Sequence, residues 1–179
     1  MGENDPSAFP NGVASTLQDS VGANYLTTVG GPFYDTNVSS EASARVGSTF
    51  AVNFFSGGAN ASGALLTNVT DNFGLEGWFK PTSTSGNHCL MYSGNTGNSG
   101  WGVMQVGNTF QGLFGGVTFF GSGAVSLNTW THVALVRNAG TATLYVNGVS
   151  AGTTTSTPNA SSGKFAIGSS PPTLIADFI

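Results

Sequence analysis

Apolar and polar residues alternate along much of the chain with a period of two, which is the pattern of β-strands. The pattern is most regular in Trp130–Arg137, where apolar side chains would lie on both faces of the strand. Such a strand is typical of the centre of a sheet, with protein packed on each side. A second regular strand is predicted over Phe73–Lys80, and Pro81 ends it.

Turn-forming residues separate further short strands at intervals of about 8–12 residues, as in β-sandwiches. Asn147-Gly148 is the strongest turn signal, because a type I′ hairpin turn needs positive φ at both central residues. No stretch of ten residues has helical periodicity with caps, and no internal repeat occurs. The other strands are predicted over Tyr25–Val29, Thr49–Phe55, Leu65–Val69, His88–Tyr92, Gly102–Val106, Thr109–Phe114, Val117–Phe120, Thr141–Val146, Val149–Thr153, Lys164–Gly168 and Leu174–Ile179.

The composition supports a folded all-β domain. Gly, Ser, Thr and Asn make up nearly half of the 179 residues, a bias that could by itself indicate a flexible chain. However, 39% of the residues are hydrophobic and 11% are aromatic, which is enough apolar surface for a core. Turn formers interleaved with aromatic residues therefore predict many short strands joined by tight turns.

The charge balance excludes two classes of partner. The chain has only four Lys and Arg residues against eight Asp and Glu, a net charge of −4. So few cations cannot neutralise a run of phosphates, so we predict no nucleic-acid binding. A polybasic membrane surface is excluded for the same reason. No apolar run approaches the length of a membrane span, so membrane insertion is not expected either.

The termini and the cysteine content bear on where the protein works. Residues 1–6 are polar and acidic, and they contain no secretory signal. We therefore expect a protein that is either extracellular after removal of a leader or carried on a virion surface. Cys89 is the single cysteine, so no internal disulfide can form, and we expect it to be a small buried residue.

Five segments together resemble the laminin-G-like and concanavalin-A-like jelly-roll domains. Three of them carry the regular strands and the hairpin, and two resemble the segments that open such domains. Their order and spacing also match, over roughly residues 17–179. The segments are Asp71–Pro81, Trp130–Arg137, Thr143–Gly148, Gln18–Gly31 and Phe50–Phe54.

The resemblance implies an all-β fold of two packed antiparallel sheets, a jelly-roll sandwich. Domains of this kind often bind glycans or proteins, and often a calcium ion near one edge. The stretch where the family commonly carries paired acidic residues, Phe54–Ser62, has no carboxylate here, so we predict no cofactor. If calcium were bound, Asp177 or backbone oxygens would remain as ligands.

The resemblance also divides the chain. We expect a loop-rich N-terminal extension over residues 1–16 and a single jelly-roll domain over residues 17–179. The family tends to finish with an acidic residue leading into a further strand, and this sequence ends at Asp177-Phe178-Ile179. We therefore expect either that the chain is a shortened product that lacks its last strand or that a partner supplies this strand.

The acidic residues do not support catalysis. Glucanases on this fold carry carboxylates two residues apart on one strand face, so that acid and nucleophile flank the same bond. Glu41 and Glu76 have no carboxylate two or four residues away, and Glu3 has only Asp5 near the terminus. Sequence motifs of other hydrolases are also missing. We therefore predict a protein that is not an enzyme and has no catalytic residues.

Several functional-looking side chains have simpler structural interpretations. His132 is expected to be a sheet histidine with a satisfied ring nitrogen. Glu76 is expected to be a hydrogen-bond acceptor, paired with Arg137 or with a neighbouring backbone group. Trp78 and Trp130 lie in the most regular strands, and we expect both in the core.

The predicted ligand site is built around the polar segment between residues 93 and 100. Trp101 and Tyr92 flank this segment, and Asn95 and Asn98 lie within it. Aromatic faces can meet the C–H groups of a sugar while amides bridge its hydroxyls, so these four residues form a candidate glycan site. In the alternative interpretation, Trp101 only fills the end of the sandwich.

Two functions remain open. The first is a non-catalytic module that binds a glycan or a protein surface through its charge-poor, Ser/Thr/Asn/Gly-rich exterior. The second is a virion structural protein, such as a capsid-decoration or tail-fibre jelly roll, that acts through contacts in a larger homo- or hetero-assembly.

Overall fold

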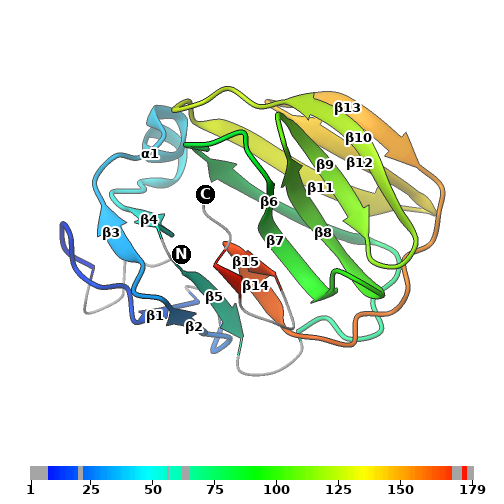
Figure 1. Cartoon of the computed structure of the whole chain (residues 1–179), viewed down its shortest axis with the longest axis horizontal. Coiled ribbons are helices and arrows are strands. Elements are labelled where there is room, and N and C mark those ends of the chain that lie inside the picture. Colours follow the sequence, from blue (N-terminus) through cyan, green and yellow to red (C-terminus); the bar gives the residue numbers. More distant parts are fainter. Residues whose placement is uncertain (1–7, 20–21, 56, 62–64, 171–174, 177–179) are drawn as a thin grey trace.

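The computed structural model describes residues 8–19, 22–55, 57–61, 65–170 and 175–176. In this part of the chain the fold is an antiparallel β-sandwich of two main sheets, as predicted (Figure 1). The larger sheet has eight strands in the order β1 (Thr16–Leu17), β2 (Leu26–Val29), β5 (Gly58–Ala61), β14 (Phe165–Ile167), β7 (Asn87–Asn95), β8 (Ser99–Val106), β9 (Thr109–Phe114) and β10 (Thr118–Ala124).

The smaller main sheet has four strands within the described residues. Its order is β13 (Val149–Thr154), β12 (Thr141–Val146), β11 (Thr131–Asn138) and β6 (Phe73–Phe79). Two short pairs complete the fold: β3 (Phe33–Asp35) with β4 (Ala51–Asn53), and β15 (Ser169–Ser170) with β16 (Ile175–Ala176). Helix α1 (Ser40–Val46) connects β3 to β4, and Figure 1 shows α1 close to the end of β6, the edge strand of the four-stranded sheet.

The main core lies between the two large sheets. Phe73 of β6 stacks on Trp101 of β8 with ring centroids 3.8 Å apart, and both belong to one buried cluster with Phe114 and Leu135. A second cluster, which includes Leu17, lies under β1, β2 and β5. The described part of the predicted N-terminal extension packs against this second cluster, because β1 begins at Thr16 and Ala14 is fully buried.

Most predicted strands are present, and the turn at Asn147-Gly148 has the expected geometry, with φ of 50° and 77°. The strand predicted over Leu65–Val69 is wrong: these residues form turns, and Leu66 and Asn68 have positive φ. Strand β5 was not predicted, because Gly57 and Gly58 follow the strand predicted over Thr49–Phe55 and two consecutive glycines usually indicate that a strand has ended. A Cβ atom at Gly58 would lie 2.3 Å from the Cβ of Ser169, so the close approach of the two chain segments requires glycine.

Helix α1 was not predicted either. At seven residues, it is shorter than the ten-residue window in which the sequence showed no helical pattern. Local signals define its ends: the Ser39 side chain accepts a hydrogen bond from the Ala42 amide, and Gly47 ends the helix in the left-handed conformation. Glu41 and Arg45 form an ion pair along its surface at 3.0 Å.

The predicted pairing of Glu76 with Arg137 is wrong. Arg137 lies on the inner face of β11, where its Nε is 3.3 Å from Asp71 and its Nη1 donates to the Ser156 carbonyl at 2.7 Å. Glu76 points to the other side of the sheet, where its carboxylate is 3.4 Å from the Nε2 of His132. Alternation along β6 and β11 therefore separates the two residues.

Candidate functional site

The structure contradicts the aromatic half of the predicted glycan site. Trp101 is fully buried, and its Nε1 donates to the Val69 carbonyl at 2.9 Å. Tyr92 is also fully buried, because its hydroxyl donates to the Ser99 carbonyl and accepts from the Gly115 amide, both at 3.0 Å. Neither ring offers a face to a ligand, so the prediction that they stack on a sugar is wrong. Trp101 instead fills the sandwich, as the alternative interpretation expected.

The two asparagines of that prediction lie at the tip of the β7–β8 hairpin. Asn95 is half-buried, and its Oδ1 accepts from the Gly97 amide at 2.9 Å. Asn98 is exposed, and its backbone carbonyl accepts from the Asn159 side chain. The structure does not bring these amides together with an exposed aromatic ring of the predicted site, and their role in binding stays a prediction.

The outward surface of the four-stranded sheet carries a group of aromatic residues that are half-buried. Trp78 of β6 pairs in register with His132 of β11, and their ring centroids are 5.2 Å apart. Trp130 lies two residues before His132, and Tyr145 of β12 follows on the next strand; all four side chains are half-buried. We call Trp78, Trp130, His132 and Tyr145 the aromatic face.

The prediction that Trp78 and Trp130 lie in the core is therefore wrong. Both were assigned to the core because their strands are so regular. Regularity describes both faces of a strand, whereas in β6 the core contacts are made by the other face, through Phe73 and Phe79.

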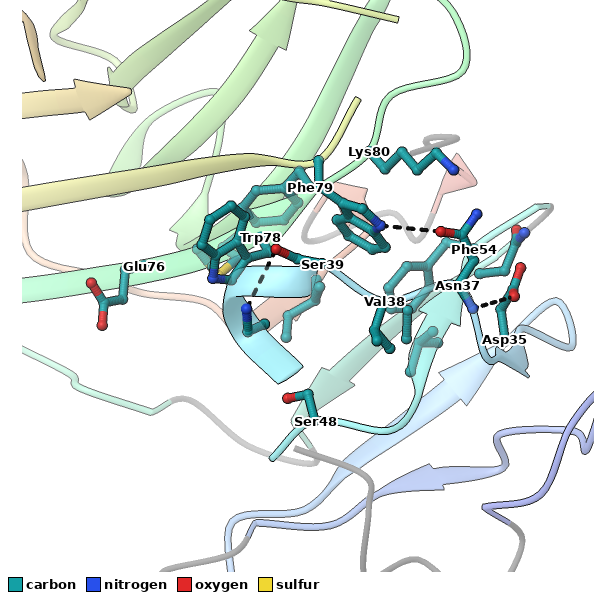
Figure 2. A pocket seen from close by; sticks show the side chains of 18 of the residues that line it. Asp35, Asn37, Val38, Ser39, Ser48, Phe54, Glu76, Trp78, Phe79 and Lys80 are labelled. Atoms are coloured by element: carbon teal, nitrogen blue, oxygen red, sulfur yellow. Dashed lines mark hydrogen bonds between the residues drawn. The ribbon is translucent and has the colours of Figure 1, made fainter. Parts of the chain in front are cut away.

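Polar groups surround the aromatic face. The indole Nε1 of Trp130 donates to the Asn37 side-chain oxygen at 3.3 Å, which ties the ring to the segment before α1. Asn37 is itself held by a hydrogen bond from its backbone amide to the Asp35 carboxylate at 2.8 Å. Lys80 and Glu76 follow the same face of β6 as Trp78. Figure 2 shows Trp78 beside Ser39 and α1, with Asn37, Asp35 and Lys80 farther along the same opening.

A cavity of about 670 Å³ opens at the edge of the aromatic face. Its mouth is polar and aromatic, with Asn37, Trp78, Lys80 and Trp130 among its residues. Its floor is apolar and includes the buried side chains of Leu17, Phe54, Phe79 and Met91. The cavity therefore joins an aromatic rim to the interior between the sheets (Figure 2).

One wall of this cavity is a strand edge. Consecutive residues of β6, from Leu75 to Phe79, line one side, and Ala51–Asn53 of β4 lines the other. Among the described residues, β6 pairs with β11 alone. The other edge of β6 therefore presents backbone donors and acceptors toward the cavity.

The acidic, histidine and cysteine side chains of the described residues do not form a cluster. Calcium takes several oxygen ligands, usually with carboxylates among them. No three His, Cys, Asp or Glu side chains converge among the described residues. Asp177, named above as a possible ligand, lies outside the described residues. The described residues also include no helix that is long and apolar enough to cross a membrane.

The family comparison agrees with the fold. Residues 55–178 match the family model described as the concanavalin A-like lectin/glucanases superfamily. Among curated proteins, none is significantly similar in sequence to this chain.

Three solved structures illustrate the similarity. Domain 4 of AbnA, a GH43 extracellular arabinanase from Geobacillus stearothermophilus, was solved with arabinotriose; it is 17% identical, with a TM-score of 0.62 over 84% of this chain and 72% of that one. A candidate carbohydrate-binding protein from Bacteroides ovatus is 17% identical, with a TM-score of 0.51 over 74% and 45% of the two chains. Trypanosoma rangeli sialidase, solved with sialic acid, is 18% identical, with a TM-score of 0.62 over 96% and 28%.

At these identities the similarity shows the fold alone. The chain spans less than half of the second and third structures, so the activities of those whole proteins do not transfer to it. None of the three is described as a virion protein, and the virion interpretation gains no support from them.

Proposed function

The chain belongs to the concanavalin A-like lectin/glucanases superfamily, and on that premise we propose that it is a non-catalytic glycan-binding module whose sugar site is the aromatic face. The observation that carries this proposal is the placement of Trp78 and Trp130, half-exposed, at the mouth of one cavity together with Asn37. Aromatic rings contact the C–H faces of sugars, and a few fixed polar groups orient the hydroxyls. The hydrogen bond from Trp130 to Asn37 supports the proposal, because it fixes the ring before a ligand arrives.

The carboxylates at this site favour binding over hydrolysis. A glycosidase needs two carboxyl groups that flank the scissile bond, one of them held as an acid by an apolar environment. The side chain of Glu76 is 71% exposed and lies beside His132. Asp35 is engaged with the Asn37 amide on another element. We infer from this arrangement that the protein holds glycans without cleaving them.

We propose an extracellular location for the module. The structurally similar arabinanase domain belongs to an extracellular enzyme, and a glycan-binding surface is useful where glycans are displayed. The alternative is that the same face binds a protein surface. A protein that copurifies with the chain but not with the Trp78→Ala variant would indicate this alternative.

We also propose that residues 17–179 form one jelly-roll domain with room for a further strand beside β6, either incomplete in this chain or contributed by a partner. The edge of β6 that no described strand covers supports this proposal, as does the apolar floor beneath it. Amide hydrogen exchange tests it. Amides of β6 that face the cavity should exchange faster than those of β11, whereas equal protection would mean that this edge is already covered.

A glycan array followed by calorimetry tests the sugar site. Trp78→Ala should weaken binding of any array ligand by about tenfold or more, because it removes the stacking surface. Phe119→Ala is the matched control, since Phe119 is a 49% exposed aromatic residue on β10 of the other sheet. Thermal unfolding should show both variants folded. Retention of full affinity by Trp78→Ala would reject the aromatic face as the site.

A further inference from the structure

Resting on the proposed function, we propose that the aromatic face binds neutral glycans and discriminates against anionic ones, such as sialylated, uronic or sulfated sugars. Proteins recognise carboxylate and sulfate groups mainly through cations, above all through the paired donors of arginine. The chain has four Lys and Arg residues in all, and the structure describes each of them. The positions of these four side chains decide which glycans the face can hold.

Arg137 is committed to the interior. Only 3% of the residue is exposed, its guanidinium lies over the Phe114 ring and forms an ion pair with Asp71, and its Nη1 donates to the Ser156 carbonyl. Arg137 lies on the inner face of β11, whereas the aromatic face is on the outer one. It therefore cannot reach a sugar on that face.

Arg45 and Lys164 are engaged away from the site. Arg45 pairs with Glu41 on the surface of α1, and it is not among the residues that line the cavity. Lys164 precedes β14 in the larger sheet, and its amino group donates to the Asn60 side chain at 3.3 Å. Of the four Lys and Arg side chains, Lys80 is therefore the one that lies at the mouth of the cavity.

Lys80 shares that mouth with two carboxylates. Asp35 and Glu76 both line the same cavity, so the local charge of these three groups is −1. An anionic sugar would meet repulsion from two carboxylates against attraction from one ammonium group, which is a hydrated point charge without the fork of arginine. Like charges brought together in this way disfavour the wrong ligand.

The same groups suit neutral sugars. Carboxylates accept hydrogen bonds from hydroxyl groups, and Asn37 and Asn128 add amides that both donate and accept. The indole rings need only C–H groups from the ligand. Every polar partner at the mouth can therefore be satisfied by a hydroxylated, uncharged glycan such as arabinotriose.

Matched neutral and anionic probes test this inference with the full chain. Lactose is compared with sialyllactose, and trigalactose with trigalacturonate, together with arabinotriose, on an array and then by calorimetry. We expect neutral probes to bind at least about tenfold more tightly than their anionic counterparts. Glu76→Gln, which removes a negative charge with little change of shape, should narrow this gap several-fold. Lys164→Met, remote from the face, is the control and should leave both affinities unchanged.

The outcomes separate the two proposals. Equal or tighter binding of the anionic probes, abolished by both Trp78→Ala and Lys80→Met, would overturn the neutral preference while the aromatic face remained the site. If no probe or array glycan bound to the folded protein, the proposed function itself would fail. The inference would also be contradicted if Glu76→Gln left the difference in affinity between neutral and anionic probes unchanged, because the charge argument predicts a smaller difference in this variant.

Discussion

The β7–β8 hairpin and the aromatic face both place tryptophan near small polar residues, yet they use it in opposite ways. Trp101 of β8 points between the sheets and is fully buried, while Trp78 of β6 and Trp130 before β11 point outward and stay half-exposed. The strands are similarly regular, so regularity does not decide the difference. The deciding factor is which face of each strand meets the opposite sheet. A tryptophan is a core residue or a ligand contact according to that face.

Among the variants that test this difference, Trp101→Ala should have the largest effect on the free energy of unfolding. The indole stacks on Phe73 and donates to Val69, so its removal leaves a large cavity and an unpaired carbonyl. We expect the free energy of unfolding to fall by about 3–5 kcal/mol, measured by denaturant titration. Trp78→Ala is the matched variant and should cost about 1 kcal/mol or less. Similar losses for the two variants would contradict the assignment of one tryptophan to the core and the other to the surface.

A smaller effect is expected at the buried end of β11. Asp71→Asn removes the charge that faces the Arg137 guanidinium, which keeps its hydrogen bond to Ser156. We expect a loss of about 2 kcal/mol in the free energy of unfolding, because a buried cation is left less well compensated. The double variant Asp71→Asn with Arg137→Met should lose less than the sum of the single variants. Strict additivity would show that the two groups do not interact. Glycan affinity should not change, since both side chains lie away from the aromatic face.

The sequence could predict the sandwich because its signals were local. Alternation marked β6 and β11, and Asn147-Gly148 marked the hairpin that follows. It could not predict β5, because the glycine that looked like a strand end is required by contact with Ser169 from a distant part of the chain. The turn at Leu66 could not be predicted either. Leucine rarely adopts a positive φ, so its presence does not indicate a turn.

The site was harder to predict than the fold, although one signal was present. Trp78 shares a strand face with Glu76 and Lys80, and two charged neighbours on one face indicate that this face meets solvent. By contrast, the hydrogen bond between Trp130 and Asn37 joins residues 93 positions apart, and no local pattern indicates it. The burial of Tyr92 also depends on a distant partner, the amide of Gly115.

The burial of Tyr92 in the β7–β8 hairpin should make the stability of the protein depend on pH in the alkaline range. Burial raises the pKa of Tyr92 well above its usual range, although the hydrogen bond from Gly115 opposes this. Since the folded state holds the proton more tightly than the unfolded one, stability is fully present below about pH 10 and is lost above it. We expect the free energy of unfolding to fall by up to about 1.4 kcal/mol per pH unit there. Tyr92→Phe should remove this part of the pH dependence, and an unchanged slope would contradict the burial argument.

The smallest expected effect on stability is at the tip of the β7–β8 hairpin. Variants there also test whether the glycan site lies at this tip or on the aromatic face. Asn95→Ala with Asn98→Ala removes both amides of the first predicted site, and the side chain of Asn95 accepts a local turn hydrogen bond from the Gly97 amide. We expect a loss of less than about 0.5 kcal/mol per residue in stability. Glycan affinity should change by less than about twofold, whereas Asn37→Ala should reduce it several-fold because Asn37 orients Trp130. Calorimetry with the same array ligand measures both variants. A larger loss from the hairpin variant than from Asn37→Ala would move the glycan site back to the β7–β8 tip, where the amides would have to act without an exposed Trp101 or Tyr92.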